Sequence, residues 1–230
     1  MSLKNERKKT KKKRNLNIFY NFVKFTGAIP VLFWIRPKVV YCGTQKKRKL
    51  RGGALIVSNH VSMTDPLSLL CTFWYRIPRF VATKEIFRHP AGNFFFTAMH
   101  CIKVDRENFN MSTFHEVSDE LARKKAVVFF PEGQINESSG GTMPFKAGAI
   151  LMAYKNGVPV LPVCIVDRKK WYRRQVVLIG DPVDVRARCG SRPSIDALNA
   201  VSEELRLTEA ELLERYTERK NKKRKKEIQS

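Results

Sequence analysis

The sequence predicts an α/β fold in which a layered sheet is flanked by helices and preceded by an N-terminal membrane-associated helical motif. Short apolar runs alternate with helical stretches along the 230 residues, which is typical of strands alternating with helices. The run "ALIVSN" at residues 54–59 is apolar almost throughout, as in a strand buried within a parallel sheet. A broken apolar segment lies near the N-terminus. At 43% hydrophobic residues, the chain is long enough for one sizeable core.

Four segments follow from the charge and hydropathy along the chain. Residues 1–15 and 216–230 are basic tails, residues 16–36 form the membrane-associated helical motif, and residues 37–215 form the α/β domain. Within the motif, "NIFYNFVKFTGAIPVLFWI" lacks a small-residue cleavage site, which disfavours a signal peptide. Gly27 and Pro30 interrupt it, and a bilayer span needs about 20 apolar residues. A broken amphipathic or re-entrant helix pair lying in one leaflet fits better, and an ordinary buried helix is the alternative.

The predicted elements of the domain follow in order. Apolar runs predict strands, and Pro, Gly or polar turns separate them from helices. The helix that begins near residue 65 has Asp65 at its N-cap and Pro66 at its first position. Pro90 breaks the helical stretch at 84–100, and Gly157 ends the helix at 145–157. Strands are expected at 38–42, 54–59, 79–83, 101–104, 126–130, 158–166 and 175–180, and helices at 65–75, 84–100, 110–124, 145–157 and 194–220.

The charge of the chain favours a polyanionic partner. Forty-four Lys and Arg against 21 Asp and Glu give a net charge of +23. Such a field suits nucleic acid, an anionic membrane surface, or a phosphate-rich or acidic ligand. No RRM, KH or helix-turn-helix signature is present and the charge gathers at the tails, so we expect no specific nucleic acid partner. Beside the apolar segment, the basic flanks favour an anionic membrane surface, with merely solubilising tails as the alternative.

The five cysteines contain no CxxC pair and do not stand at metal-ligand spacing with histidine. An odd number of cysteines without a framework indicates reduced thiols facing the cytosol. We therefore expect no metal site and no cofactor, and a protein associated with the cytoplasmic face of a membrane.

A histidine and an aspartate stand five positions apart twice, as His60 with Asp65 and as His100 with Asp105. His60 follows the strand at 54–59, and ligands of α/β folds bind beyond the carboxyl ends of the strands. His100 and Asp105 flank an extended run, where an odd separation places side chains on opposite faces. His60 is therefore the candidate general base, oriented by Asp65. The alternative is that Asp65 caps the helix and His60 fills the turn.

Two more strand ends carry polar residues. Glu132 and Gly133 follow the strand at 126–130. There Glu132 and backbone N–H groups can line the same site as His60, beyond the carboxyl ends of the strands. Arg106 follows the strand at 101–104 and can clamp a phosphate group. Since "GxSxG" is absent, direct attack by a substrate hydroxyl is favoured over a covalent acyl-enzyme.

The blocks "NHVSMTDP", "IKVDR", "FFPEG" and "VPVLPV", in this order and at this spacing, resemble those of the glycerolipid acyltransferase family over residues 18–180. The most similar type is the 1-acylglycerol-3-phosphate acyltransferases, which make phosphatidic acid. The resemblance implies an acyltransferase domain at 37–215 that transfers a fatty acyl group from acyl-CoA or acyl carrier protein to a lysophospholipid acceptor. It further implies that His60 and Asp65 are catalytic, that Asn59 beside them contacts substrate, that Arg106 binds phosphate, and that Glu132 and Gly133 belong to the third block.

The third block departs from the family pattern. It usually reads Glu-Gly-Thr-Arg-Ser, whereas here Ile135 stands where the arginine that helps to hold the acceptor phosphate is expected. Judged by their position relative to the four blocks, Lys84 and Lys146 are the nearest cations that can take the place of this arginine. Otherwise the acceptor is a different lysolipid, such as a lysophospholipid with a headgroup or an amino-acid-based lipid. The intact His60 and Asp65 disfavour a lipid-binding protein without turnover.

Overall fold

The computed structural model describes residues 18, 21–22, 26, 34–43, 50–105, 111–132, 145, 148–168 and 173–229. The strands are β1 (Lys38–Tyr41), β2 (Ala54–Ser58), β3 (Arg79–Thr83), β4 (Ile102–Val104), β5 (Ala126–Phe129), β6 (Val160–Val166) and β7 (Val176–Ile179). The helices are α2 (Asp65–Thr72), η1 (a 3-10 helix, Lys84–Phe87), α3 (Pro90–Ala98), α4 (Met111–Ala122), α5 (Gly148–Asn156), α6 (Val185–Cys189) and α7 (Ile195–Gln229).

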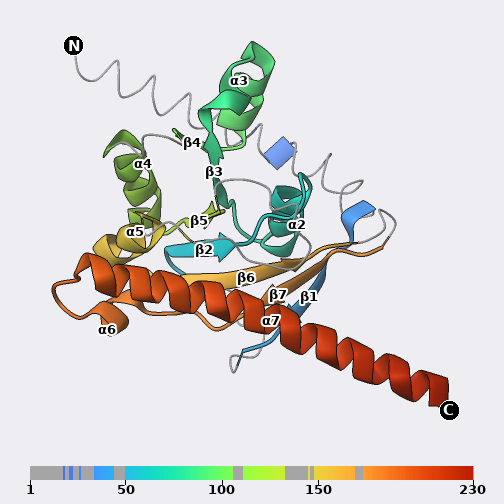
Figure 1. Cartoon of the computed structure of the whole chain (residues 1–230). Helices are drawn as coiled ribbons and strands as arrows, with labels where there is room; N and C mark the ends of the chain where they lie inside the picture. Colours follow the sequence, from blue (N-terminus) through green and yellow to red (C-terminus); the bar gives the residue numbers. More distant parts are fainter. Residues whose placement is uncertain are drawn as a thin grey trace, which may run out of the picture.

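The seven strands form one sheet in the order β1-β7-β6-β2-β5-β3-β4 (Figure 1). The central strand β2 pairs in parallel with both β5 and β6, which confirms the prediction from its apolar run. The parallel pairs continue through β3 to β4, whereas β7 runs antiparallel to β6. The carboxyl ends of β2, β3, β4, β5 and β6 therefore lie along one edge of the sheet, which we call the carboxyl edge.

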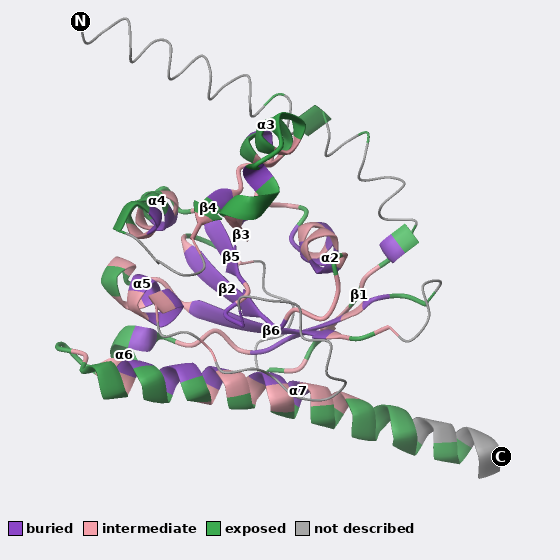
Figure 2. Ribbon diagram, turned by 45° about the horizontal axis from the view of Figure 1, so that its top comes forward, coloured by how far each residue is buried: buried purple, intermediate pink, exposed green. Residues whose placement is uncertain are grey.

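Helices cover both faces of this sheet, with α2 and α7 on opposite sides (Figure 2). On one face, Leu55 and Val57 of β2 pack in a core with apolar residues of α4, α5 and α7. On the other face, Ile56 packs with Leu69 of α2. Alternate side chains of a strand point to opposite faces, so a strand covered on both faces has to be apolar throughout. This packing explains the uninterrupted run that identified β2.

The helices also differ from the sequence prediction in places. The break near Pro90 is confirmed, because η1 ends at Phe87 and α3 begins at Pro90. Gly157, with φ +60°, ends α5 as expected, since glycine adopts this conformation without strain. The five-residue helix α6 was not predicted, because it is too short to show a periodicity. Helix α7 continues beyond its predicted end at residue 220 as far as Gln229, in a segment where lysine, arginine and glutamate are good helix formers.

Most of the expected membrane-associated motif at residues 16–36 lies outside the described residues. Of its last residues, Ile35 is fully buried in the domain and Trp34 is exposed. Across the part of the chain that the structure describes, no helix has both the length and the apolar character needed to cross a bilayer.

Candidate active site

The turn at residues 59–64 connects β2 to α2 at the carboxyl edge, and Asp65 closes it. Asp65 is 0% exposed, and its Oδ2 lies 2.9 Å from Nδ1 of His60. The same oxygen accepts the backbone N–H groups of Val61 and Ser62, each over 2.7 Å. The prediction of Asp65 as N-cap is wrong: the N-cap is Thr64, and Asp65 is the first helical residue. Its carboxylate bonds the N–H groups that precede the helix instead of those inside it.

His60 is held on two sides. An ionised carboxylate only accepts hydrogen bonds, so Asp65 fixes the His60 tautomer with the proton on Nδ1. The imidazole also stacks on Phe130, just beyond the end of β5, with ring centroids 4.3 Å apart. The His60 side chain retains 17% exposure. The arrangement therefore orients the ring and leaves Nε2 as the basic nitrogen.

His100 and Asp105 are arranged differently. His100 lies in the turn before β4 with φ +60°, and Asp105 follows the end of that strand. The carboxylate of Asp105 forms an ion pair with Lys84, with Nζ and Oδ2 2.6 Å apart. The structure thus brings His60 and Asp65 together, whereas Asp105 pairs with Lys84.

The Asn59 carboxamide forms two hydrogen bonds with the backbone of Ile165. Its Nδ2 donates to the carbonyl oxygen of Ile165 over 3.0 Å, and its Oδ1 accepts the N–H of Ile165 over 2.7 Å. The last registered pair between the two strands is Ser58 with Val163. The buried Asn59 side chain therefore extends the pairing of β2 with β6 by side-chain hydrogen bonds and fixes the start of the turn that carries His60.

The other expected site residues fall into two groups. Glu132 is buried just after β5, and Lys84 is exposed at the end of β3 with its charge paired to Asp105. Both lie at the carboxyl edge. Arg106, Gly133, Lys146 and also Ile135 lie outside the described residues, so the roles expected of them stay predictions. Within the described ranges, no three or more His, Cys, Asp or Glu side chains gather as a metal site would require. All five cysteines are described, and each is a free thiol.

Sequence reasoning missed Glu209, a fully buried carboxyl group on α7. Burial raises the pKa of Glu209 well above the ordinary value of 4.5, the neighbouring Glu132 raises it further, and the Asn59 backbone N–H partly offsets this. A second carboxyl group thus lies beside Glu132 and the start of the turn at 59–64. A signal was present in the sequence: Glu209 stands between Leu205 and Leu212 at the i, i+4, i+7 spacing of a buried helix face.

Glu209→Gln is expected to flatten the pH dependence of stability. The raised pKa keeps the carboxyl group protonated in the folded state above pH 4.5, where the unfolded chain has already lost the proton. The free energy of unfolding therefore falls as pH rises from 4.5 toward the folded-state pKa, by up to about 1.4 kcal/mol per pH unit. Urea unfolding between pH 5 and pH 8 measures this slope. The matched control is Glu214→Gln, exposed on the same helix, and parallel curves for the wild type and Glu209→Gln would contradict the expectation.

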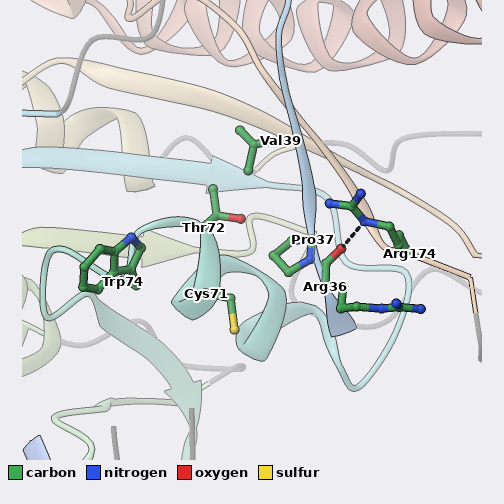
Figure 3. Close-up of a pocket in the computed structure, with 7 residues that line it drawn as sticks. All are labelled: Arg36, Pro37, Val39, Cys71, Thr72, Trp74 and Arg174. Atoms are coloured by element: carbon green, nitrogen blue, oxygen red, sulfur yellow. Dashed lines mark hydrogen bonds between the residues drawn. The ribbon is translucent and has the colours of Figure 1, made fainter. Parts of the chain in front are cut away.

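A separate pocket of about 560 Å³ opens between the start of β1 and the end of α2. Figure 3 shows Arg36 and Arg174 on one side and Trp74 on the other, with Arg174 Nε donating to the Arg36 carbonyl oxygen over 2.9 Å. All three side chains are exposed. Two guanidinium groups and an indole line the pocket, and none of the expected site residues does.

Comparison with known proteins identifies the fold and the family of this chain. The crystal structure of the 1-acyl-sn-glycerophosphate (LPA) acyltransferase PlsC from Thermotoga maritima matches with a TM-score of 0.59 at 23% identity, over 88% of this chain and 83% of that one. The fold is therefore the α/β fold of that protein. The family model for Acyltransferase matches residues 38–166, which include His60, Asp65 and Glu132. This chain belongs to the acyltransferase family.

Two relatives are named 1-acyl-sn-glycerol-3-phosphate acyltransferase. The protein from Borreliella burgdorferi is 27% identical over 161 residues, which are 68% of this chain and 63% of that protein. The protein from Haemophilus influenzae is 30% identical over 197 residues, which are 74% of this chain and 78% of that protein. The match thus spans somewhat less than two thirds of the Borreliella protein and more than three quarters of the Haemophilus protein.

Proposed function

We propose that the protein transfers a fatty acyl group from acyl-CoA or acyl carrier protein to the free hydroxyl of 1-acylglycerol-3-phosphate, giving phosphatidic acid. The observation that carries the proposal is the pair of His60 and Asp65, joined over 2.9 Å at the carboxyl edge of a domain of the acyltransferase family. The names of the relatives support the acceptor.

In the proposed reaction, Nε2 of His60 takes the proton from the acceptor hydroxyl as its oxygen attacks the thioester carbonyl. Asp65 stabilises the imidazolium that forms, and the N–H bonds from Val61 and Ser62 hold its carboxylate in place. Collapse of the tetrahedral intermediate breaks the carbon–sulfur bond, and the imidazolium returns its proton to the leaving thiolate. The products are phosphatidic acid and the free thiol of the donor.

Competition between acceptors tests the substrate. The enzyme receives equal amounts of 1-acylglycerol-3-phosphate, a lysophospholipid with a choline headgroup and an amino-acid-based lysolipid in mixed vesicles with one acyl donor. Phosphatidic acid is expected as the main product. A main product built on another acceptor would support the second candidate function, acylation of a different lysolipid, which Ile135 in the third block favours.

We propose further that the protein works at the cytoplasmic face of a membrane, on an anionic surface. The net charge of +23 supports this, as do the exposed apolar side chains of Ile18, Phe22 and Trp34 in the N-terminal segment. The pocket with Arg36, Arg174 and Trp74 offers the pairing of cations and indole suited to a headgroup region.

Sedimentation with vesicles measures this association. Binding is expected to vesicles that contain phosphatidylglycerol and to weaken as salt rises, since exposed charges are screened beyond a Debye length of about 8 Å at physiological ionic strength. Vesicles of phosphatidylcholine alone are the control. Equal binding to both vesicles at low salt would contradict an electrostatic contribution.

A further inference from the structure

Arg168 lies at the carboxyl edge, two residues beyond the end of β6. Because β6 pairs in parallel with β2, the ends of both strands reach the turn at 59–64. Nη2 of Arg168 donates to Oγ1 of Thr64 over 3.4 Å, and Thr64 immediately precedes Asp65. The Arg168 guanidinium therefore adjoins the turn that carries His60, although the two residues are more than 100 positions apart in the chain.

The Arg168 guanidinium is held in place by an aromatic side chain. It lies 5.5 Å from the ring centroid of Trp34, a cation–π distance, and Trp34 is anchored next to the fully buried Ile35. Among the described residues, Arg168 forms no ion pair with a carboxylate, and its buried Nη1 has no hydrogen-bond partner. By contrast, Lys84 at the same edge is paired with Asp105.

A buried N–H group that lacks a partner is unfavourable, and a guanidinium presents its donors as a planar fork that matches phosphate oxygens. An anion bound at Nη1 of Arg168 would give this atom an acceptor and would also neutralise the charge. The proposed acceptor carries a phosphate on the carbon next to the one that bears its hydroxyl. Holding that phosphate beside the turn at 59–64 keeps the hydroxyl on the side where His60 lies.

We propose that Arg168, supported by Trp34, binds the phosphate monoester of the acceptor and determines specificity for a phosphorylated lysolipid. This inference rests on the proposed function and deepens it. It assigns to the end of β6 a cation that the third block lacks, since Ile135 carries no charge.

The test compares two acceptors, 1-acylglycerol-3-phosphate and monoacylglycerol, which lacks the phosphate. Arg168→Ala is expected to raise KM for the phosphorylated acceptor and to lower the kcat/KM preference for it over monoacylglycerol, on the order of 10- to 100-fold. Arg168→Lys is expected to restore part of the preference, because an ammonium keeps the charge but not the fork. Arg51→Ala is the matched control, since it removes one exposed positive charge at the opposite end of β2.

Three results would overturn the inference alone, each in a wild type that does form phosphatidic acid. The first is an unchanged acceptor preference in Arg168→Ala. The second is a rise in KM for the acyl donor instead of the acceptor, which would place the CoA phosphates at Arg168. The third is the same loss of preference in Thr64→Val, which would mean that Arg168 acts only by holding the turn. A wild type that acylates no phosphorylated lysolipid would overturn the proposed function, and the inference with it.

Discussion

His60→Ala is expected to lower kcat on the order of 10²- to 10⁴-fold, the contribution typical of a general base. The acceptor hydroxyl is a poor nucleophile until its proton is removed, and Nε2 of His60 is the basic nitrogen at the carboxyl edge. The fold should be retained, because the His60 side chain is partly exposed and its main packing contact is the stack on Phe130. Steady-state kinetics, with thermal unfolding measured on the same preparation, checks both parts.

The matched control is His115→Ala, which removes an exposed histidine from α4. It should match the wild type in kcat and in melting temperature. A His60→Ala protein that is folded and keeps most of its kcat would show that proton transfer does not depend on this imidazole.

Asp65→Asn is expected to lower kcat on the order of 10²-fold or more while the fold persists. An asparagine oxygen in the place of Asp65 Oδ2 can still accept the N–H groups of Val61 and Ser62, but a neutral amide does not offset the positive charge of the imidazolium as a carboxylate does. Asp65→Ala removes that acceptor as well. It should also reduce the free energy of unfolding by about 1 to 3 kcal/mol, since the partly buried N–H groups of Val61 and Ser62 lose their acceptor.

The two Asp65 variants separate the two roles that the sequence left open for this residue. If Asp65→Asn has the kcat of the wild type and only Asp65→Ala is impaired, Asp65 serves the turn and not the chemistry. Kinetics and urea unfolding on both variants decide between these outcomes.

Much of the fold could be predicted because its cause is local. Strand β2 is apolar and buried from Ala54 to Val57, and the alternation of such runs with helical stretches indicates a covered sheet. The antiparallel placement of β7 beside β6 left no such mark in the sequence. The short helix α6 is stabilised by Asp184, whose side chain accepts the N–H groups of Arg186 and Ala187, and this cap alone was too small a signal.

In the candidate site, too, only the contacts between residues close in the chain could be predicted. His60 and Asp65 were predictable as a pair because one short turn joins them. The contact of Asn59 with Ile165 and that of Arg168 with Thr64 join residues 106 and 104 positions apart, and the parallel pairing of β2 with β6 creates both. Glu209 on α7 lies beside Glu132 and the Asn59 backbone, which are far from it in the chain, so its spacing marked burial but not location.

The proposed reaction is tested by following phosphatidic acid formation from 1-acylglycerol-3-phosphate and an isotope-labelled long-chain acyl donor, offered as acyl-CoA and as acyl carrier protein thioester. The product is identified by mass spectrometry in membranes that carry the wild type or His60→Ala. Labelled phosphatidic acid is expected from the wild type with at least one donor, and its loss in His60→Ala. A folded wild type that forms none with either donor would contradict the proposed function.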